Sequence, residues 1–219
     1  MNPHHHLDTA TLIGYSSGAL PTAFTVVVRT HLDACAQCRR QLLDADRVGG
    51  QLLRQQEGAP LRAAARDNIL ARVQSEPMLA ATPALDVSAH ADADLLPVSL
   101  RAYFGTRYSE LRWNWIGPGV QHIRANDVDD SHLMLLRTAP GRCIPQHGHT
   151  GNELTMILRG AYDDALGHFA PGDVADLDDA VEHQPVTAAG VHCICVAATD
   201  APLRFSGWMA RTLQPLFRL

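Results

Sequence analysis

Three potential metal ligands close together in the chain constrain its N-terminal fold more than any other feature. His31, Cys35 and Cys38 have the spacing H-x3-C-x2-C. On an α-helix, residues three and four apart share one face, so the spacing predicts three ligands on one face of a helix. Two thiolates and an imidazole suit Zn²⁺, which takes four ligands when its role is structural. The alternatives are two ordinary buried cysteines with a surface histidine, or a purely redox Cys-x-x-Cys pair.

A fourth zinc ligand must come from outside this motif. The run His4-His5-His6 offers three candidates, and a helix-loop-helix hairpin between residues 7 and 30 would return any of them to the motif. Asp8 is expected to cap the first helix, which ends at Gly18, and Pro21 to open the second. Spacing alone does not choose among the three histidines.

Two further helices are predicted in this region. The third carries the metal motif and weakens at Gly49-Gly50, and the fourth is an amphipathic stretch from Leu61 to Pro77. The region holds more apolar side chains than so small a bundle can hide. Two interpretations follow: the fourth helix completes a zinc-stapled four-helix core, or it moves and leaves a groove for a partner helix.

Composition excludes several functional classes. The sequence has no apolar run of roughly 18 residues and no signal-peptide layout, so we expect a cytoplasmic protein without a membrane partner. Five cysteines, two of them assigned to metal, argue against a disulfide framework. Every basic residue is arginine and the net charge is -5, which disfavours nonspecific nucleic-acid binding through phosphate neutralisation.

The chain length of 219 residues allows two domains, and the pattern changes between them. Residues 1–76 form the predicted helical domain. Residues 77–97 lack a sustained period and are framed by prolines, so they are interpreted as a linker. His90, Asp92 and Asp94 could suggest a metal site, but a solvated tether is the preferred interpretation. Residues 98–219 have short alternating apolar runs, which are typical of an all-β domain.

The β domain contains a second metal motif. The pattern G-x5-H-x-H-x3-E-x6-G runs from Gly141 to Gly160 without a gap and is similar to the first motif of the cupin family. His147 and His149 share one face of a strand, and Glu153 begins the neighbouring strand after a short turn. The motif therefore predicts three inward ligands inside a small β-barrel of the jelly-roll type. The overall fold class is α + β with two domains.

Resemblance extends this assignment to a fourth cupin ligand, His183. The turn of the second cupin motif corresponds to Pro171-Gly172-Asp173, although the usual spacing of that motif is not kept. Three imidazoles and a carboxylate suit Zn²⁺, Fe²⁺, Mn²⁺ or Ni²⁺, and a divalent metal, with zinc as our first choice, is expected there.

An enzyme is the main alternative function, because cupins with an open metal position include dioxygenases and isomerases. Tyr162, Arg159 and Glu182 are equally well explained as structural, and no second set of acid, base and substrate-binding residues accompanies the metal motif. No enzymatic activity and no catalytic residue are therefore predicted. Cys193 and Cys195 share one face of a strand, as small core residues or as a redox-sensitive pair with poor disulfide geometry.

The N-terminal pattern resembles the zinc-binding anti-sigma (ZAS) family. The resemblance rests on an upstream histidine, the H-x3-C-x2-C motif, and Tyr15, Gly18 and Leu20 at the first turn. It covers the whole chain to the final Leu-Phe-Arg-Leu and points to members with a C-terminal cupin. It implies His6 as the fourth zinc ligand and a groove in the helical domain. It also implies one-to-one inhibition of an extracytoplasmic-function (ECF) sigma factor, with release by singlet oxygen that requires the cupin.

Overall fold

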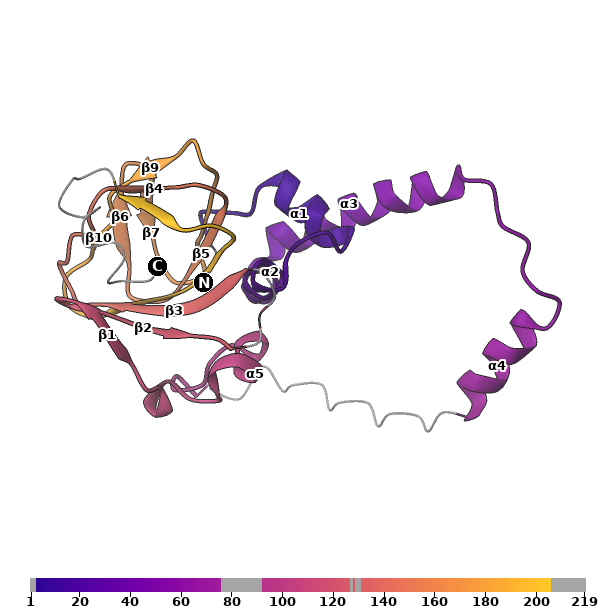
Figure 1. Cartoon of the computed structure of the whole chain (residues 1–219), viewed down its shortest axis with the longest axis horizontal. Coiled ribbons are helices and arrows are strands. Elements are labelled where there is room, and N and C mark those ends of the chain that lie inside the picture. The colour runs from indigo at the N-terminus through magenta and orange to yellow at the C-terminus, as the bar shows by residue number, and fades with distance from the viewer. Residues whose placement is uncertain (1–2, 76–91, 127, 129–130, 206–219) are drawn as a thin grey trace.

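A computed structural model of the chain describes residues 3–75, 92–126, 128 and 131–205. Figure 1 shows a β-sandwich at one end, helices α1, α2 and the start of α3 beside it, and α4 set apart. The predicted linker residues 77–91, with His90, and the C-terminal Leu-Phe-Arg-Leu lie outside the described residues.

The four predicted N-terminal helices are present, as α1 (Thr9–Ser16), α2 (Thr22–Ala34), α3 (Ala36–Arg54) and α4 (Ala65–Ser75). Asp8 caps α1, as predicted, since its carboxylate accepts a hydrogen bond from the Ala10 backbone N–H at 2.9 Å. Gly18 ends the turn after α1 with a φ of 70°, a conformation that favours glycine. Helix α3 runs through Gly49-Gly50 without a break.

The prediction that His31, Cys35 and Cys38 lie on one helix is wrong. His31 is in the last turn of α2, Cys38 is in the first turn of α3, and Cys35 lies between them in an extended conformation (φ -110°, ψ 106°). The Cys35 sulfur accepts the Cys38 backbone N–H at 3.4 Å and so caps α3. The chain therefore turns at Cys35, and the thiol takes the place of a side-chain oxygen at the helix N-terminus.

The predicted four-helix core is not present in the described residues. Helix α4 buries none of its side chains, and α3 buries only Cys38. Ile69, Leu70 and Val73 of α4 are 57%, 44% and 70% exposed. Helix α4 lies away from α1–α3 in this structure (Figure 1). An amphipathic pattern predicts that the apolar face of a helix will be covered, but it does not say which element or partner covers it.

In the described residues, the β part begins with short helical turns and continues as twelve strands. The helical turns are Val98–Leu100, α5 (Arg101–Phe104) and Tyr108–Glu110. The strands are β1 (Asn114–Gly117), β2 (Val120–Arg124), β3 (His132–Thr138), β4 (His147–His149), β5 (Glu153–Arg159), β6 (Tyr162–Asp164), β7 (Gly167–Phe169), β8 (Val174–Leu177), β9 (Glu182–His183), β10 (Val186–Thr187), β11 (Cys193–Thr199) and β12 (Leu203–Phe205).

These strands form a cupin-like β-sandwich, in agreement with the cupin fold that the motif predicts, although the prediction described it as a small barrel. One layer is a six-stranded sheet in the order β1-β2-β3-β11-β5-β8, with antiparallel pairing throughout. The other strands form two three-stranded sheets, β10-β6-β7 and β12-β4-β9. Strand β4 carries the first two histidines of the motif and pairs with β9, which places His147 directly opposite His183.

Helix α2 packs on the outer face of the six-stranded sheet. It buries eight of its thirteen residues, which is far more than α3 or α4 buries. One continuous core joins the helix to strands β3, β5, β8 and β11. Its members include Phe24, Val27, Val28, Leu32, Leu133, Leu135, Leu154, Met156, Val174, Val196 and Ala198. The helical and β parts therefore share a hydrophobic core, and the sandwich has a second, smaller cluster of its own that includes Ile157, Tyr162 and Phe169.

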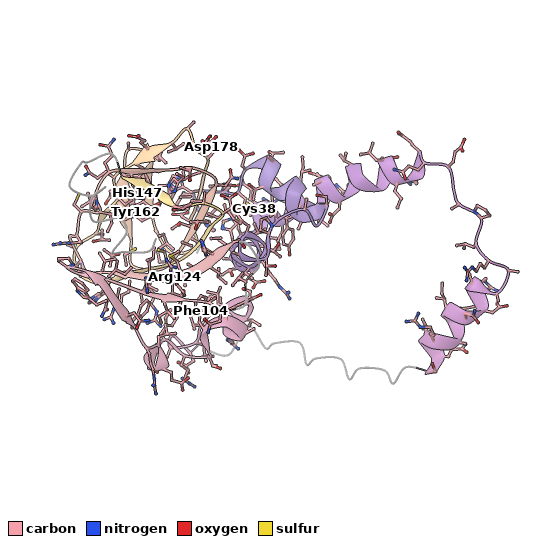
Figure 2. All side chains as sticks on the ribbon, in the orientation of Figure 1. Cys38, Phe104, Arg124, His147, Tyr162 and Asp178 are labelled. Carbon is pink, nitrogen blue, oxygen red and sulfur yellow. The ribbon has the colours of Figure 1, made fainter. Side chains whose placement is uncertain are left out.

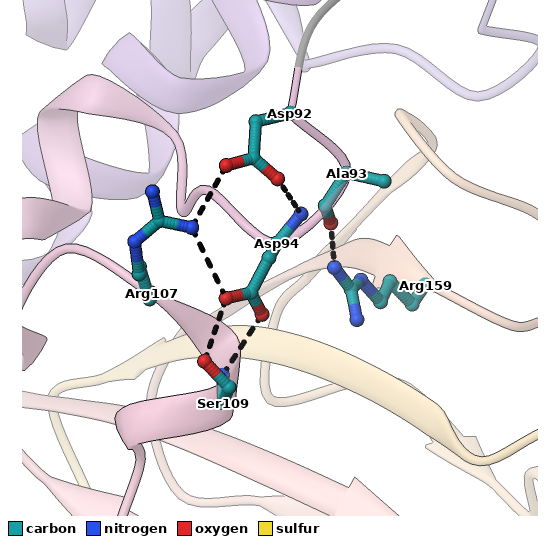
Figure 3. A network of polar contacts seen from close by, with 6 residues as sticks. All are labelled: Asp92, Ala93, Asp94, Arg107, Ser109 and Arg159. Carbon is teal, nitrogen blue, oxygen red and sulfur yellow. Dashed lines mark hydrogen bonds and ion pairs between the residues drawn. The ribbon is translucent and has the colours of Figure 1, made fainter.

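The described end of the predicted linker contacts the β part. Arg107 donates to Asp92 at 2.8 Å and to Asp94 at 3.4 Å, and Ser109 donates to Asp94 through its hydroxyl and its backbone N–H (Figure 3). Leu96 is only 1% exposed. These contacts differ from the solvated tether that the sequence suggested. Sequence reasoning missed them because the pattern of charges did not reveal Arg107 as the partner of Asp92 and Asp94.

Candidate metal centres

The structure brings together one imidazole nitrogen or thiol sulfur from each of four residues. The ligand atoms of His6, His31, Cys35 and Cys38 all lie within 4.8 Å of one another. The His31 Nε2 to Cys38 Sγ and His6 Nδ1 to Cys35 Sγ distances are both 3.3 Å, and His6 Nδ1 to Cys38 Sγ is 3.7 Å. Tetrahedral Zn²⁺ with ordinary bond lengths separates a nitrogen and a sulfur ligand by about 3.6 Å. The donor set and its spacing therefore fit a closed zinc site.

Burial shifts the pKa values of two of these residues, His31 and Cys38. Burial is the main cause that lowers the pKa of His31 to about 4, so its imidazole is neutral near pH 7. Burial likewise raises the pKa of Cys38 to about 11, so a thiolate at this position needs a cation beside it. Metal binding at this group is consequently linked to proton release from the thiols.

A second group of ligand atoms lies inside the β-sandwich. His147, His149 and His183 are buried, and their ligand nitrogens lie within 4.8 Å of one another. His147 Nε2 and His183 Nε2 are 3.1 Å apart. The buried His149 Nε2 has no hydrogen-bond partner in the described part of the chain. A metal ion would satisfy this nitrogen, and the donor set fits a divalent cation.

Glu153, the carboxylate of the predicted cupin site, lies beside these histidines but outside the group. It begins β5 as expected, and its Oε2 is 3.4 Å from His149 Nδ1. Its Oε1 accepts a hydrogen bond from the Thr155 hydroxyl at 2.8 Å. The carboxylate is therefore close to the group and is held in place by its neighbour on the same strand.

Two groups that sequence reasoning missed orient the imidazoles of His147 and His183. Asp164, whose side chain is fully buried, accepts from His183 Nδ1 at 3.0 Å. The Pro145 carbonyl accepts from His147 Nδ1 at 2.8 Å. Partners of this kind fix the ring and leave Nε2 free to bind a metal. Asp164 is contributed by β6, just after the end of the histidine motif and 19 residues before His183, and no spacing in the motif pointed to it.

Other residues considered in the sequence occupy different surroundings. Arg159 stacks over the Tyr108 ring at 3.7 Å and donates to the Ala93 carbonyl, which is a structural role (Figure 3). Glu182 and His183 line a cavity of about 400 Å³. Tyr162 is buried in the sandwich, as Figure 2 shows, and its hydroxyl has no hydrogen-bond partner among the described residues.

Cys193 and Cys195 point into the sandwich from β11. Burial raises the pKa of Cys193 to about 11, and the same cause raises that of Cys195. Both side chains therefore favour the protonated thiol, which is the less reactive form. Neither thiol forms a disulfide.

The two candidate metal centres are separate, with Cys38 among the helices and His147 inside the sandwich (Figure 2). None of the helices in the described ranges is long and apolar enough to cross a membrane.

Three comparisons with known proteins each find a ChrR-type relative. Residues 102–201 match the family described as the ChrR Cupin-like domain. The anti-sigma-E factor ChrR of Cereibacter sphaeroides is 36% identical over 219 residues, which is 100% of both chains. A chain in the crystal structure of Rhodobacter sphaeroides SigE in complex with the anti-sigma ChrR is 32% identical. It covers 91% of this chain and 100% of its own, with a TM-score of 0.73.

Proposed function

The chain belongs to the ChrR family of anti-sigma factors, and from this premise we propose that it binds and inhibits an ECF sigma factor and releases it in response to singlet oxygen. The similarity covers both chains completely, and a matching structure holds a ChrR anti-sigma factor together with SigE. A non-enzymatic regulator of transcription follows from this relationship. A partner that acts on RNA polymerase places the complex in the cytoplasm.

Within the structure, the observation that supports binding of a partner is the exposed apolar surface of α3 and α4. On α3, Val48 and Leu52 are one helical turn apart and are 61% and 57% exposed. Helix α3 has nineteen residues and buries only Cys38. Apolar surface of this kind on a projecting helix marks a site of protein interaction. We assign this surface to the sigma factor.

The group of four candidate ligands at the junction of α2, α3 and the N-terminal segment is proposed to hold Zn²⁺. The ligands would be His6, His31, Cys35 and Cys38, which leave no open position, so the ion would be structural and would join α2 to α3 and to the N-terminal segment. The group in the sandwich is proposed to hold a divalent metal, with zinc as first choice, through His147, His149 and His183, and with Glu153 as the adjacent carboxylate.

Purification of this chain together with an ECF sigma factor from the same organism tests the main proposal. We expect a one-to-one complex that withholds the sigma factor from RNA polymerase in a transcription assay. Sigma-dependent transcription that continues at full rate with excess anti-sigma chain would contradict the assignment.

The role of the sandwich metal is tested by His147→Ala. This change removes one of the three converging imidazoles, so we expect the sandwich to lose its metal and the reporter response to photosensitised singlet oxygen to fall. Complex formation with the sigma factor should remain, because the apolar surface of α3 lies elsewhere. His192→Ala, which alters an exposed histidine of the same domain, is the matched control. Full induction in the metal-free variant would rule out a sensing role for the site.

A further inference from the structure

The N-terminal segment that delivers His6 is held by the β-sandwich. The backbone N–H groups of His4 and His5 both donate to Asp173 Oδ1, at 2.5 and 3.0 Å. The His5 ring stacks on Phe169, with centroids 3.9 Å apart and an interplanar angle of 21°. On the other side of His6, the Asp8 N–H donates to Asp176 at 2.9 Å. His6 is thus flanked on both sides by contacts with the sandwich.

Asp173 is itself fixed in the turn between β7 and β8. Asp173 is only 1% exposed, and its Oδ2 accepts a hydrogen bond from the Ala170 backbone N–H at 2.8 Å. Gly172 has a φ of +99°, and a Cβ there would lie 3.2 Å from Pro3 Cγ. A larger residue at 172 would therefore be strained and would press on the segment. The turn fits the N-terminal segment closely.

The same turn contacts a second ligand of the helical centre. The Gly172 carbonyl accepts a hydrogen bond from His31 Nδ1 at 2.9 Å. This bond fixes the ring so that Nε2 faces the Cys38 sulfur, 3.3 Å away. A hydrogen bond from the outer nitrogen of a ligating histidine both sets its tautomer and orients the ring. One turn of the sandwich therefore supports both histidines of the helical metal centre.

We propose that the β7–β8 turn, residues 170–173, supplies the outer shell of the helical zinc centre. In this role Asp173 is a positioning residue for His6, and the Gly172 carbonyl positions His31. The sandwich thus controls how firmly the helical centre retains its metal, although it contributes none of the four ligands. The proposal rests on the assignment of a metal to those ligands and is independent of sigma-factor binding.

The test uses the full chain loaded with Co²⁺. Thiolate-to-cobalt absorption reports only the helical centre, because the proposed ligands in the sandwich include no cysteine. Asp173→Asn removes the negative charge and one of the two oxygen acceptors that hold the backbone N–H groups of His4, His5 and Ala170. Loss of outer-shell partners typically weakens metal binding by about 10–100-fold. We expect release of cobalt to a chelator to accelerate by at least about tenfold, with a shifted ligand-field spectrum.

Two further variants keep the test decisive. Asp179→Asn makes the same charge change at an exposed position and should leave release unchanged. His5→Ala removes the stack on Phe169 but keeps the backbone hydrogen bonds, and it should accelerate release to a smaller extent even where Asp173→Asn folds poorly. A wild-type chain without the thiolate band would overturn the metal centre together with this proposal. A normal band with unchanged release and spectrum in Asp173→Asn and His5→Ala would overturn the outer-shell role alone.

Discussion

Replacing Cys38 with serine is expected to empty the helical metal centre and to detach α3 from the rest of the molecule. Cys38 is the only residue that α3 buries, so few apolar contacts remain to hold this helix once the metal is lost. Apparent binding free energies of structural zinc are about 10–16 kcal/mol near neutral pH. This amount is comparable to the whole stability of an ordinary domain, about 5–15 kcal/mol.

The loss of stability in Cys38→Ser should not affect all helices equally. Helix α2 buries eight residues, largely against the six-stranded sheet, so its contacts do not depend on the metal alone. Amide hydrogen exchange in Cys38→Ser should therefore rise strongly in α1 and α3 and much less in α2 and β11. Metal analysis should show that only the sandwich metal remains.

Cys143→Ser is the matched control, because Cys143 is a free and exposed cysteine outside both metal centres. This variant should keep both metals and the exchange pattern of the wild type. A Cys38→Ser chain that keeps its full metal content and slow exchange in α3 would show that the group of four is not a zinc centre.

The sequence motifs predicted which candidate ligands converge better than they predicted the groups that support them. His31, Cys35 and Cys38 converge in the structure as their spacing suggested, although Cys35 breaks the helix on which that argument relied. His6 was selected by resemblance, because three adjacent histidines offer equal chemistry. Asp164 and Asp173 were missed as supports, since each contacts a histidine or its segment from a distant strand or turn. Local periodicity carries no information about such contacts.

The shared core was also missed, although α2 gives a sign of it. Val26, Val27 and Val28 are consecutive and all buried, so the helix is covered around most of its circumference. A helix that is apolar on several faces is buried between layers. The sequence interpretation considered a four-helix core or a groove for a partner helix, whereas the sandwich covers α2. The predicted division into independent domains did not consider this possibility.

The second large effect is expected from Val48→Asp combined with Leu52→Asp on α3. Both side chains are exposed in the free chain, so the two changes should leave its folding stability nearly unaltered, within about 0.5 kcal/mol for each site. In the complex the same positions would be buried against the sigma factor. Truncation of a hot-spot residue at the centre of an interface costs about 2 kcal/mol or more, and a buried unpaired charge adds to this cost.

We therefore expect the dissociation constant for the sigma factor to increase by at least about 100-fold, measured by calorimetry with the full chain. Gln51→Asp combined with Asn68→Asp adds the same charge at exposed polar positions of α3 and α4 and should have a much smaller effect. The comparison separates loss of apolar contact from simple repulsion, because only the first pair removes apolar surface. Wild-type affinity in the Val48→Asp, Leu52→Asp chain would show that the exposed face of α3 is not where the sigma factor binds. Equal weakening by both pairs would indicate that charge, and not burial of this face, controls the interaction.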